Sequence, residues 1–415
     1  MQNYNNIKVG IGFATGRGSF QKVLRTYIHT WKESGLVENK RISLNLFVAY
    51  DLNYQKTKIT DYTNVEPELA GQIDSSKFIG STAIKEEIDY LIRENVIDNN
   101  EGRMIFGKGY AAKRNAVLYN AIKQNMDYLV FLDDDEYPMA VTKTRSTAIW
   151  GGQEVLTNHL KYITQADITH GNHCGYISPI PYMEFNDTMT EADFHSFIEA
   201  ISNDIINWDT LKTVMENGGV TYADTKILTS DDAVEVQEIN HAKFISGANL
   251  GINLTNLRRV FPFYNPPGAR GEDTFLSTCL SERKVLRVPC YTFHDGFSTY
   301  NDLLEGVLPI RLKFIKADTK QIITRFYKAC IGWIRYKPLL LYITQPDRYE
   351  EKIEEMREQL NEILPKICAY FGKPDFIRIL AELEEYHRNV EKHYREFLET
   401  QRIWAKIMEH FAHLQ

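Results

Sequence analysis

DYLVFLDDDE, residues 127–136, is the stretch that decides the fold. Residues 128–132 have the length and apolar composition of a buried strand, and four carboxylates follow without a spacer. Adjacent carboxylates repel one another, so a cation, protonation or solvent has to relieve the repulsion. Ligands of open α/β sheets bind beyond the carboxyl ends of strands. We therefore interpret Asp133 to Glu136 as part of a ligand site, in preference to a solvated acidic turn.

Strand-like and helix-like segments alternate around this stretch. Residues 7–13 (IKVGIGF) and 42–50 (ISLNLFVAY) are predicted strands, and residues 19–32 and 111–125 carry apolar residues at helical spacing. Strand-like patterns return at residues 243–254 and 285–293. This alternation predicts an α/β fold with a mixed, mostly parallel sheet flanked by helices.

The rest of the chain differs in charge and pattern. Residues 181–240 carry thirteen acids and two bases, and helical spacing over 194–215 predicts an inserted helical element. Residues 308–344 carry eight bases and one acid, and helical patterns follow from residue 348. From residue 375, apolar residues recur every seven positions, which predicts one long amphipathic helix of coiled-coil character.

These patterns predict two domains. Residues 1–300 form an α/β catalytic domain that carries the acidic helical insert at about 183–240. Residues 301–415 form an all-helical C-terminal domain, which serves packing or homo-oligomerisation.

Composition excludes several classes of protein. With 43% hydrophobic and 25% charged residues, the 415-residue chain is neither a disordered chain nor a fibre. A net charge of −7 speaks against a protein that coats nucleic acid. The five cysteines form no CxxC pair, which favours a reducing cytoplasm over a disulfide framework. The first residues lack the pattern of a signal peptide, and no apolar run approaches the roughly 20 residues of a membrane span.

The acidic stretch offers oxygen ligands for a divalent cation. An Asp-x-Asp at a strand end can hold Mg²⁺ or Mn²⁺ while the ion binds a diphosphate. His294, in the segment FHDG at residues 293–296, follows another predicted strand and is either a third metal ligand or a structural histidine. His170, His173 and Cys174 look like part of a metal cluster, but the sequence has no matching second pair, so structural roles are favoured.

A second carboxylate pair, Glu272 and Asp273, follows a glycine-rich approach and opens a predicted helix. It is either an N-terminal cap or a general base that takes a proton from a hydroxyl. Four bases, Arg17, Lys108, Lys113 and Arg114, lie near the predicted rim of the sheet. A cation there can steady a diphosphate or the carboxylates themselves.

Together these segments resemble a glycosyltransferase of the GT-A fold, of the inverting family 2 type. The resemblance lies in AAKRNAVL (111–118), DYLVFLDDD (127–135) and GEDTFL (271–276), which follow the family's order of helix, Asp-x-Asp strand and Glu-Asp helix. It covers roughly residues 5–300. It implies a Rossmann-like sheet that binds a nucleotide-sugar donor, with a UDP-sugar favoured, and Mn²⁺ or Mg²⁺.

The resemblance also implies roles for individual residues. The expected metal ligands are Asp133, Asp135 and His294, and the expected catalytic residues are Asp273, as the base, and Glu272 beside it. The expected donor-binding residues are Thr15, Arg17, Asp51, Arg114, Asp133 and Asp134. The turn after the first strand, ATGR, departs from the family's Pro-Thr-Tyr-Asn-like turn, and the Gln-x-x-Arg-Trp motif of processive members is missing.

The implied reaction is non-processive transfer of a sugar to an acceptor hydroxyl with inversion, in bacterial-type glycan or glycoconjugate synthesis. The implied acceptor is a glycan, glycolipid or glycoprotein. The basic stretch at 311–337 contains interleaved aromatic residues, so it either contacts an anionic membrane at its cytoplasmic face or docks on the acidic insert or another subunit.

Three other functions compete with transfer. Gly10, Gly12 and Gly16 approximate a dinucleotide motif with Asp51 as ribose ligand, but the first two fall inside the predicted strand. A NAD-dependent oxidoreductase also leaves the four carboxylates unexplained. A non-catalytic scaffold related to such transferases and a nucleotidyltransferase remain as alternatives.

Overall fold

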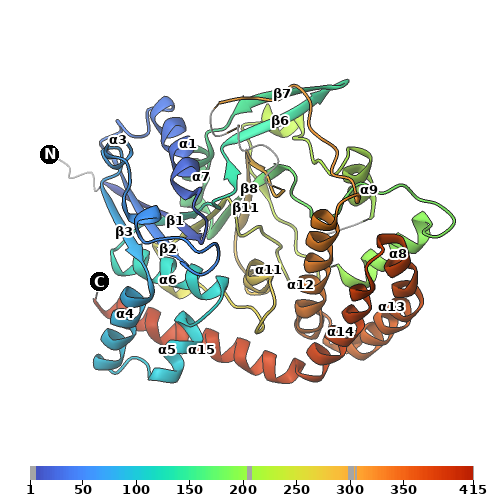
Figure 1. Ribbon diagram of the computed structural model, residues 1–415. Coiled ribbons are helices and arrows are strands. Elements are labelled where there is room, and N and C mark those ends of the chain that lie inside the picture. Colours follow the sequence, from blue (N-terminus) through green and yellow to red (C-terminus); the bar gives the residue numbers. More distant parts are fainter. Residues whose placement is uncertain (1–5, 203–207, 298–302, 304–305, 415) are drawn as a thin grey trace.

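A computed structural model of the chain describes residues 6–202, 208–297, 303 and 306–414 (Figure 1). A central sheet has helices on both sides, and a further group of helices from the C-terminal part of the chain lies beside it (Figure 1). The α/β class, with a sheet flanked by helices and a helical C-terminal extension, is therefore confirmed.

Within the described residues, the central sheet has nine strands, in the order β3-β2-β1-β4-β10-β8-β11-β5, with β9 paired to β11. The strands are β1 (Ile7–Thr15), β2 (Ile42–Tyr50), β3 (Ser75–Ile79), β4 (Tyr128–Phe131), β5 (Glu136–Tyr137), β8 (Ile168–Gly175), β9 (Val234–Glu235), β10 (Leu250–Asn253) and β11 (Val285–His294). Strands β3, β2, β1 and β4 are mutually parallel, and β8 is parallel to β11. The antiparallel strands are β10, β5 and β9. The predicted mostly parallel sheet is confirmed.

Strand β4 explains how the sheet is held between two helical layers. Its side chains alternate: Val130 belongs to one hydrophobic cluster, and Leu129 and Phe131 belong to another on the opposite face. The first cluster includes helices α1 (Phe20–Glu33) and α7 (Val155–Tyr162). The second includes α4 (Ser81–Arg93), α5 (Asn99–Phe106), α6 (Tyr110–Lys123) and α15 (Val390–Leu414). A strand buried on both faces reads as a continuous apolar run.

The remaining elements extend from this core. A two-stranded hairpin, β6 (Met139–Thr144) and β7 (Thr147–Gly152), projects beside the sheet (Figure 1). The remaining helices are α2 (Thr60–Thr63), α3 (Pro67–Ala70), α8 (Glu191–Ile201), α9 (Trp208–Glu216), α10 (Thr225–Leu228), α11 (Glu272–Ser277), α12 (Lys320–Thr344), α13 (Tyr349–Phe371) and α14 (Arg378–Arg388). The expected helical insert corresponds to α8, α9 and α10; residues 203–207 lie outside the described part.

The C-terminal helices share their hydrophobic core with the α/β part. Tyr264 and Phe275 of the α/β part belong to one buried cluster with residues of α8, α12, α13 and α14. Trp404 of α15 is buried against the layer of α5 and α6. The residues of the seven-residue repeat, Phe376, Leu383, Val390, Phe397, Trp404 and Phe411, are all buried within this chain. The apolar seam of the repeat is thus covered by the chain itself.

Two sequence predictions are wrong in detail. The predicted terminal helix is two helices, α14 and α15, separated at Asn389, and a short 3₁₀ turn (Pro374–Ile377) precedes them. Within the predicted strand 243–254, only β10 pairs with the sheet. Asn249 has a φ of 51°, which a strand does not allow, so the preceding residues leave the sheet as a loop.

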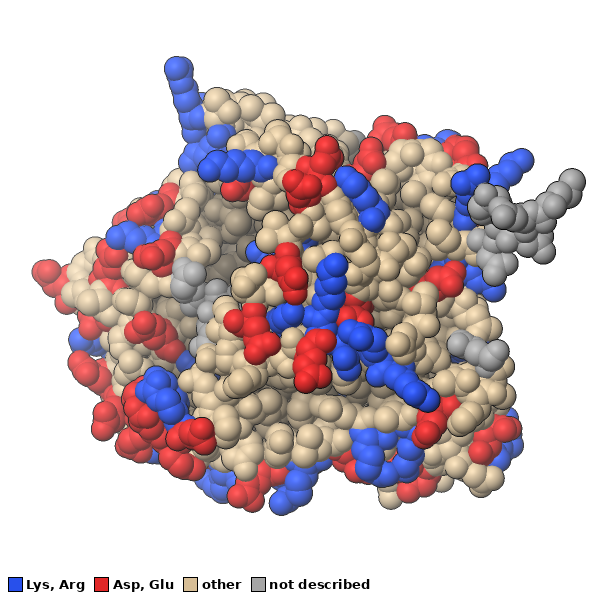
Figure 2. Space-filling view, turned by 180° about the vertical axis from the view of Figure 1, so that it is seen from behind, with Lys and Arg blue, Asp and Glu red and all other residues tan. Residues whose placement is uncertain are grey.

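Charges of both signs are mixed on the surface. Figure 2 shows acidic and basic side chains next to one another near the middle of the back face. Among the described residues, no helix is long and apolar enough to cross a membrane.

Candidate active site

The carboxylate segment lies where several strands end. Strands β1, β2 and β4 are parallel, so Thr15, Tyr50 and Phe131, their last residues, lie at one edge of the sheet. Asp133, Asp134 and Asp135 connect β4 to β5 at this edge. The predicted site residues after these strands are thus brought together by the parallel arrangement.

The loop after β1 binds two of these carboxylates. The Arg17 guanidinium lies 2.5 Å from Asp135 Oδ2 and 3.5 Å from Asp134 Oδ1. The Thr15 hydroxyl donates a hydrogen bond to Asp134 Oδ2. Burial raises the pKa of Asp134 to about 6, although the Arg17 charge opposes the shift. Asp134 is therefore turned into the protein and held by the β1 loop.

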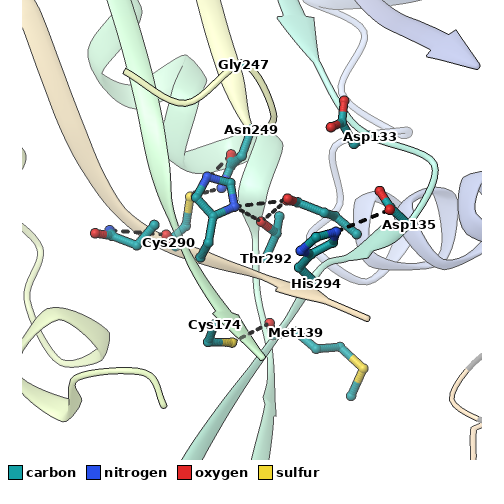
Figure 3. A network of polar contacts seen from close by, with 12 residues as sticks. Asp133, Asp135, Met139, Cys174, Gly247, Asn249, Cys290, Thr292 and His294 are labelled. Atoms are coloured by element: carbon teal, nitrogen blue, oxygen red, sulfur yellow. Dashed lines mark hydrogen bonds and ion pairs between the residues drawn. The ribbon is translucent and has the colours of Figure 1, made fainter. Parts of the chain in front are cut away.

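Asp135 pairs with His294 at the end of β11. The two side chains point toward one another (Figure 3), and Asp135 Oδ2 lies 3.2 Å from His294 Nε2. Burial disfavours the imidazolium, but the Asp135 carboxylate outweighs it and raises the pKa of His294 to about 9. Burial likewise disfavours the ionised carboxylate, yet His294 and Arg17 hold the pKa of Asp135 well below its usual range. The pair is charged at neutral pH.

Glu136, the fourth carboxylate, has no part in the open site. It accepts a hydrogen bond from the Thr292 hydroxyl and lies 3.0 Å from His173 Nδ1, and it is only 5% exposed. Burial raises the pKa of Glu136, but the combined interactions with His173, His294 and the Thr292 hydroxyl outweigh it, and the net shift is downward. Successive residues of the segment thus differ in access: the Asp133 and Asp135 side chains are 23% and 16% exposed, against 9% for Asp134 and 7% for Glu136.

Asp133 is held by α6. Tyr110 and Arg114 each donate to Asp133 Oδ1 at 3.0 Å. Burial raises the pKa of Asp133, while the Arg114 charge opposes the shift. Asp133 therefore lies apart from the Asp135–His294 pair (Figure 3), and both donors bind the same oxygen, Oδ1.

Arg114 links three segments of the site. Beyond Asp133, its guanidinium donates to the Gly247 carbonyl at 2.6 Å and lies 3.4 Å from Glu272 Oε1. The rings of Tyr110, Phe131 and Phe263 lie 5.0–5.5 Å from the guanidinium carbon. With 1% exposure, Arg114 is an internal connection between the Asp-x-Asp and the Glu-Asp helix. The sequence allows two roles for such a base, contact with a diphosphate or contact with the carboxylates. In the structure Arg114 contacts the carboxylates of Asp133 and Glu272.

The Glu-Asp pair opens α11. Gly271 precedes the helix with a φ of 91°, a left-handed conformation that glycine adopts without strain. Asp273 accepts hydrogen bonds from the backbone N–H groups of Gly247 and Thr274, each at 2.9 Å. Burial and the Asp273 charge raise the pKa of Glu272 to about 7, against the opposing charge of Arg114. Both carboxylates therefore have fixed positions.

Asp51 directly follows β2 and pairs with Lys113 of α6 at 2.9 Å. Burial raises the pKa of Asp51, but the hydrogen bonds from Lys113 and from the Asn53 N–H together with the Lys113 charge outweigh it, and the net shift is downward. This pair forms the rim of the site on the β2 side.

Arg325 of α12 is a site residue that motif reasoning missed. Its Nη2 lies 3.0 Å from the position a Cβ on Gly296 would take, and His294 Cε1 lies equally near that position. Its guanidinium lies 4.6 Å above the Phe297 ring, and its charge interacts with those of Asp135 and Arg17. The only sequence signal for it is its place in the basic stretch. The C-terminal helical region thus contributes a cation to the site.

A buried histidine supports the loop that carries Gly247. His159 of α7 makes hydrogen bonds of 2.7 Å with Thr169 Oγ1 and with Asn249 Oδ1. The carbonyl oxygen of Asn249 only accepts, so His159 Nε2 carries the proton and Nδ1 accepts from Thr169. This network holds Asn249 in its left-handed conformation two residues from Gly247.

The donor set of the site suits a cation in part. No group of three or more His, Cys, Asp or Glu side chains in the described ranges is arranged to hold a metal ion. Asp135 Oδ2 and His294 Nε2 are neighbouring donors, whereas Asp133 faces Arg114. Two protein ligands suffice where substrate phosphates and water complete the coordination of Mg²⁺, and an ion that binds here has to displace the His294 proton and the Arg17 contact from Asp135 Oδ2. The residues therefore fit an ion that binds together with a phosphorylated ligand.

Comparisons with known proteins add little. No protein-family model matches this chain, and no curated protein matches it. Among solved structures, the chain is similar to the galactosyltransferase LgtC in complex with donor and acceptor sugar analogs, at 11% sequence identity. The match covers 83% of this chain and 94% of that chain with a TM-score of 0.26, which is too low to carry an argument about fold or function.

Proposed function

We propose that this protein is a GT-A-type glycosyltransferase. It transfers a sugar from a nucleoside diphosphate sugar, with a UDP-sugar favoured, to an acceptor hydroxyl, and it inverts the anomeric configuration. The observation that carries the proposal is the convergence of an Asp-x-Asp, a histidine, a Glu-Asp pair and three arginines at one edge of a mostly parallel sheet.

The donor half of the site supplies charge for a diphosphate. Asp135 and His294 would hold Mg²⁺ or Mn²⁺, and when bound such an ion neutralises charge on the diphosphate. Arg17 and Arg325 supply cations from the β1 loop and from α12. Asp133 is fixed through Oδ1 by Tyr110 and Arg114, which leaves Oδ2 to accept a ribose hydroxyl.

The acceptor half supplies a base. Asp273 takes the proton of the acceptor hydroxyl, whose oxygen attacks the anomeric carbon. The bond between that carbon and the phosphate oxygen breaks, and its electron pair leaves with the nucleoside diphosphate. One displacement inverts the configuration. The two backbone hydrogen bonds to Asp273 fix its orientation before the acceptor binds.

A nucleotide-sugar screen tests the proposal. Purified protein is incubated with individual donors, with and without Mn²⁺, and released nucleoside diphosphate is measured. Slow metal-dependent release from one donor class is expected even without acceptor. Absence of release from every donor, together with absence of binding to any nucleoside diphosphate, would contradict the proposal, and binding without release would indicate a non-catalytic relative.

Asp273→Asn tests the base. The amide oxygen can still accept the Gly247 N–H, the Thr274 N–H loses its side-chain acceptor, and the side chain no longer takes a proton. We expect transfer to fall by at least roughly 10²-fold while donor affinity is unchanged. Turnover and donor affinity are measured separately, by product formation and by calorimetry. Near-normal turnover of the variant would show that another group is the base.

A further inference from the structure

The bases of the predicted basic stretch do not form one surface. Arg335 makes two hydrogen bonds with Glu382, at 2.7 and 2.9 Å. Lys337 is buried and donates to the carbonyls of Glu199 and Ala200. Arg325 faces the candidate active site. Lys320 and Lys328 are exposed on α12 itself, and the other three bases, Arg311, Lys313 and Lys316, lie before α12 in residues 306–317, which we call the strap.

The strap lies along the edge of the β6–β7 hairpin. The Ala148 N–H donates to the Ile310 carbonyl and the Trp150 indole donates to the Pro309 carbonyl, each at 2.8 Å. Leu312 and Ile315 are buried and anchor the strap to the molecule. In Figure 1 this segment passes beside β6 and β7 at one end of the molecule before it enters α12.

The outer side of the strap and hairpin is apolar. Ile310 is 72% exposed, Val307 57%, Ile149 50% and Leu308 43%. Ile149 lies between the two hairpin residues that bond to the strap, and its side chain points away from the buried face on which Ala148 lies, so it is exposed next to the strap. Single exposed aliphatic side chains are common on protein surfaces, whereas four of them on neighbouring segments indicate a surface that binds a partner.

The same surface is positively charged. Residues 142–152 and 306–317 contain five bases and no acid. The bases are Lys143, Arg145, Arg311, Lys313 and Lys316. Two of the bases already have partners within the protein: Lys316 lies 3.5 Å from Glu184, and Lys143 donates a hydrogen bond to Asn217. Apolar side chains with cations beside them match the boundary between the headgroups and acyl chains of an anionic bilayer.

We propose that the strap and the β6–β7 hairpin form a docking surface for an anionic lipid bilayer. Val307, Leu308, Ile310 and Ile149 enter the acyl boundary, and Arg311 and Arg145 contact the anionic headgroups. Binding to a bilayer requires protruding apolar side chains with cations beside them and does not require a shaped pocket. The strap and the hairpin have such apolar side chains and cations. The surface uses none of the candidate active-site residues, so it stands or falls independently of the proposed function.

Vesicle co-sedimentation of the full chain tests the docking surface. We expect sedimentation with vesicles of phosphatidylcholine and phosphatidylglycerol, little with phosphatidylcholine alone, and weakening at high salt. The double variant Leu308→Asp, Ile310→Asp is expected to lose at least roughly tenfold in partitioning, because both side chains leave the acyl boundary. Arg311→Gln with Arg145→Gln is expected to lose a similar factor, and only on anionic vesicles.

Ile377→Asp with Ile59→Asp is the matched control, because both isoleucines are about half exposed, at 53% and 51%, and lie outside the strap and hairpin. The control is expected to bind as the unchanged protein does, and circular dichroism verifies that each variant is folded. The proposal is overturned if the unchanged protein does not bind anionic vesicles, or if the Leu308, Ile310 variant binds as well as the control. Self-association that the same variant abolishes, without lipid binding, would assign the surface to a protein partner instead.

Discussion

Arg114 holds three segments of the candidate site together, so its removal affects more than one contact. Arg114→Met leaves the Asp133 and Glu272 carboxylates without their buried partner and the Gly247 carbonyl without its donor. We expect a loss of about 3–5 kcal/mol in the free energy of unfolding, measured by urea denaturation. Lys113→Met, one residue earlier, breaks only the pair with Asp51 at the rim and is expected to cost at most about 1 kcal/mol. Equal losses in the two variants would contradict the role of Arg114 as an internal connection.

His159 makes stability depend on pH. Burial lowers the pKa of His159 to about 4, although the hydrogen bond with Asn249 opposes the shift. The ordinary histidine pKa is about 6.5, so below that pH the unfolded chain binds a proton that the folded chain does not. Stability is therefore expected to fall as the pH drops from about 6.5 toward 4, by up to about 3 kcal/mol from this residue. Unfolding of His159→Gln, measured across this range, should show a shallower pH dependence than the unchanged protein, and identical slopes would contradict the assignment.

Helix α12 brings Arg325 to the end of β11, next to Gly296, which is the basis for a prediction about donor binding. Hydrogen bonds to charged groups contribute about 1.5–3 kcal/mol, so Arg325→Gln is expected to weaken binding of UDP with Mn²⁺ at least roughly tenfold. Titration calorimetry measures this affinity. Lys328→Gln, on the same helix and exposed, is the control and should leave the affinity unchanged. An unchanged affinity in Arg325→Gln, in a protein that binds UDP, would remove α12 from the donor site.

The elements that the sequence predicts well are those whose pattern is local. Strand β2 has the predicted bounds, and the Asp-x-Asp follows β4 as expected. Gly10 and Gly12 lie inside β1, and a Cβ on Gly12 would lie 2.7 Å from Val117 Cγ1. Close packing of α6 on the sheet therefore accounts for Gly12 without a dinucleotide. The sequence did not predict the break at Asn389, because the apolar spacing continues through it. It did not predict the loop before β10 either, because Asn249, with its positive φ, is the one residue that marks it.

Contacts between distant segments account for the site residues that the sequence did not predict. The Gly247 carbonyl and N–H meet Arg114 and Asp273 across more than twenty residues of chain, and no motif marks that loop. Arg325 likewise lies in a stretch whose other bases, Arg335 and Lys337, serve packing. Charge counts identify such a stretch as basic, but only the packing of α12 decides which base reaches the site.

The helical C-terminal region and the α/β part are expected to unfold together. Trp404 of α15 is 1% exposed in the cluster of α5 and α6, and its indole donates to the Val260 carbonyl at 3.1 Å. Lys406 and Arg402 add ion pairs to Glu101 of α5 at 2.6 and 2.8 Å. We predict that Trp404→Ala lowers the stability of the whole chain by about 3–5 kcal/mol and shifts one cooperative transition.

The measurement uses two probes that report on different parts of the molecule. Ellipticity at 222 nm reports on the helices of the whole chain, whereas heat-induced loss of UDP binding reports on the site at the edge of the sheet. If α15 is part of the same core, both probes shift together in Trp404→Ala. Leu398→Ala, in the same helix but with its side chain 45% exposed, should shift neither probe by more than about 1 kcal/mol. Joint unfolding is expected because the shared core and Arg325 require the C-terminal helices to be folded for the site to be complete. Two separate transitions, with UDP binding retained after the helices have unfolded, would contradict this prediction and make the C-terminal helices an independent domain.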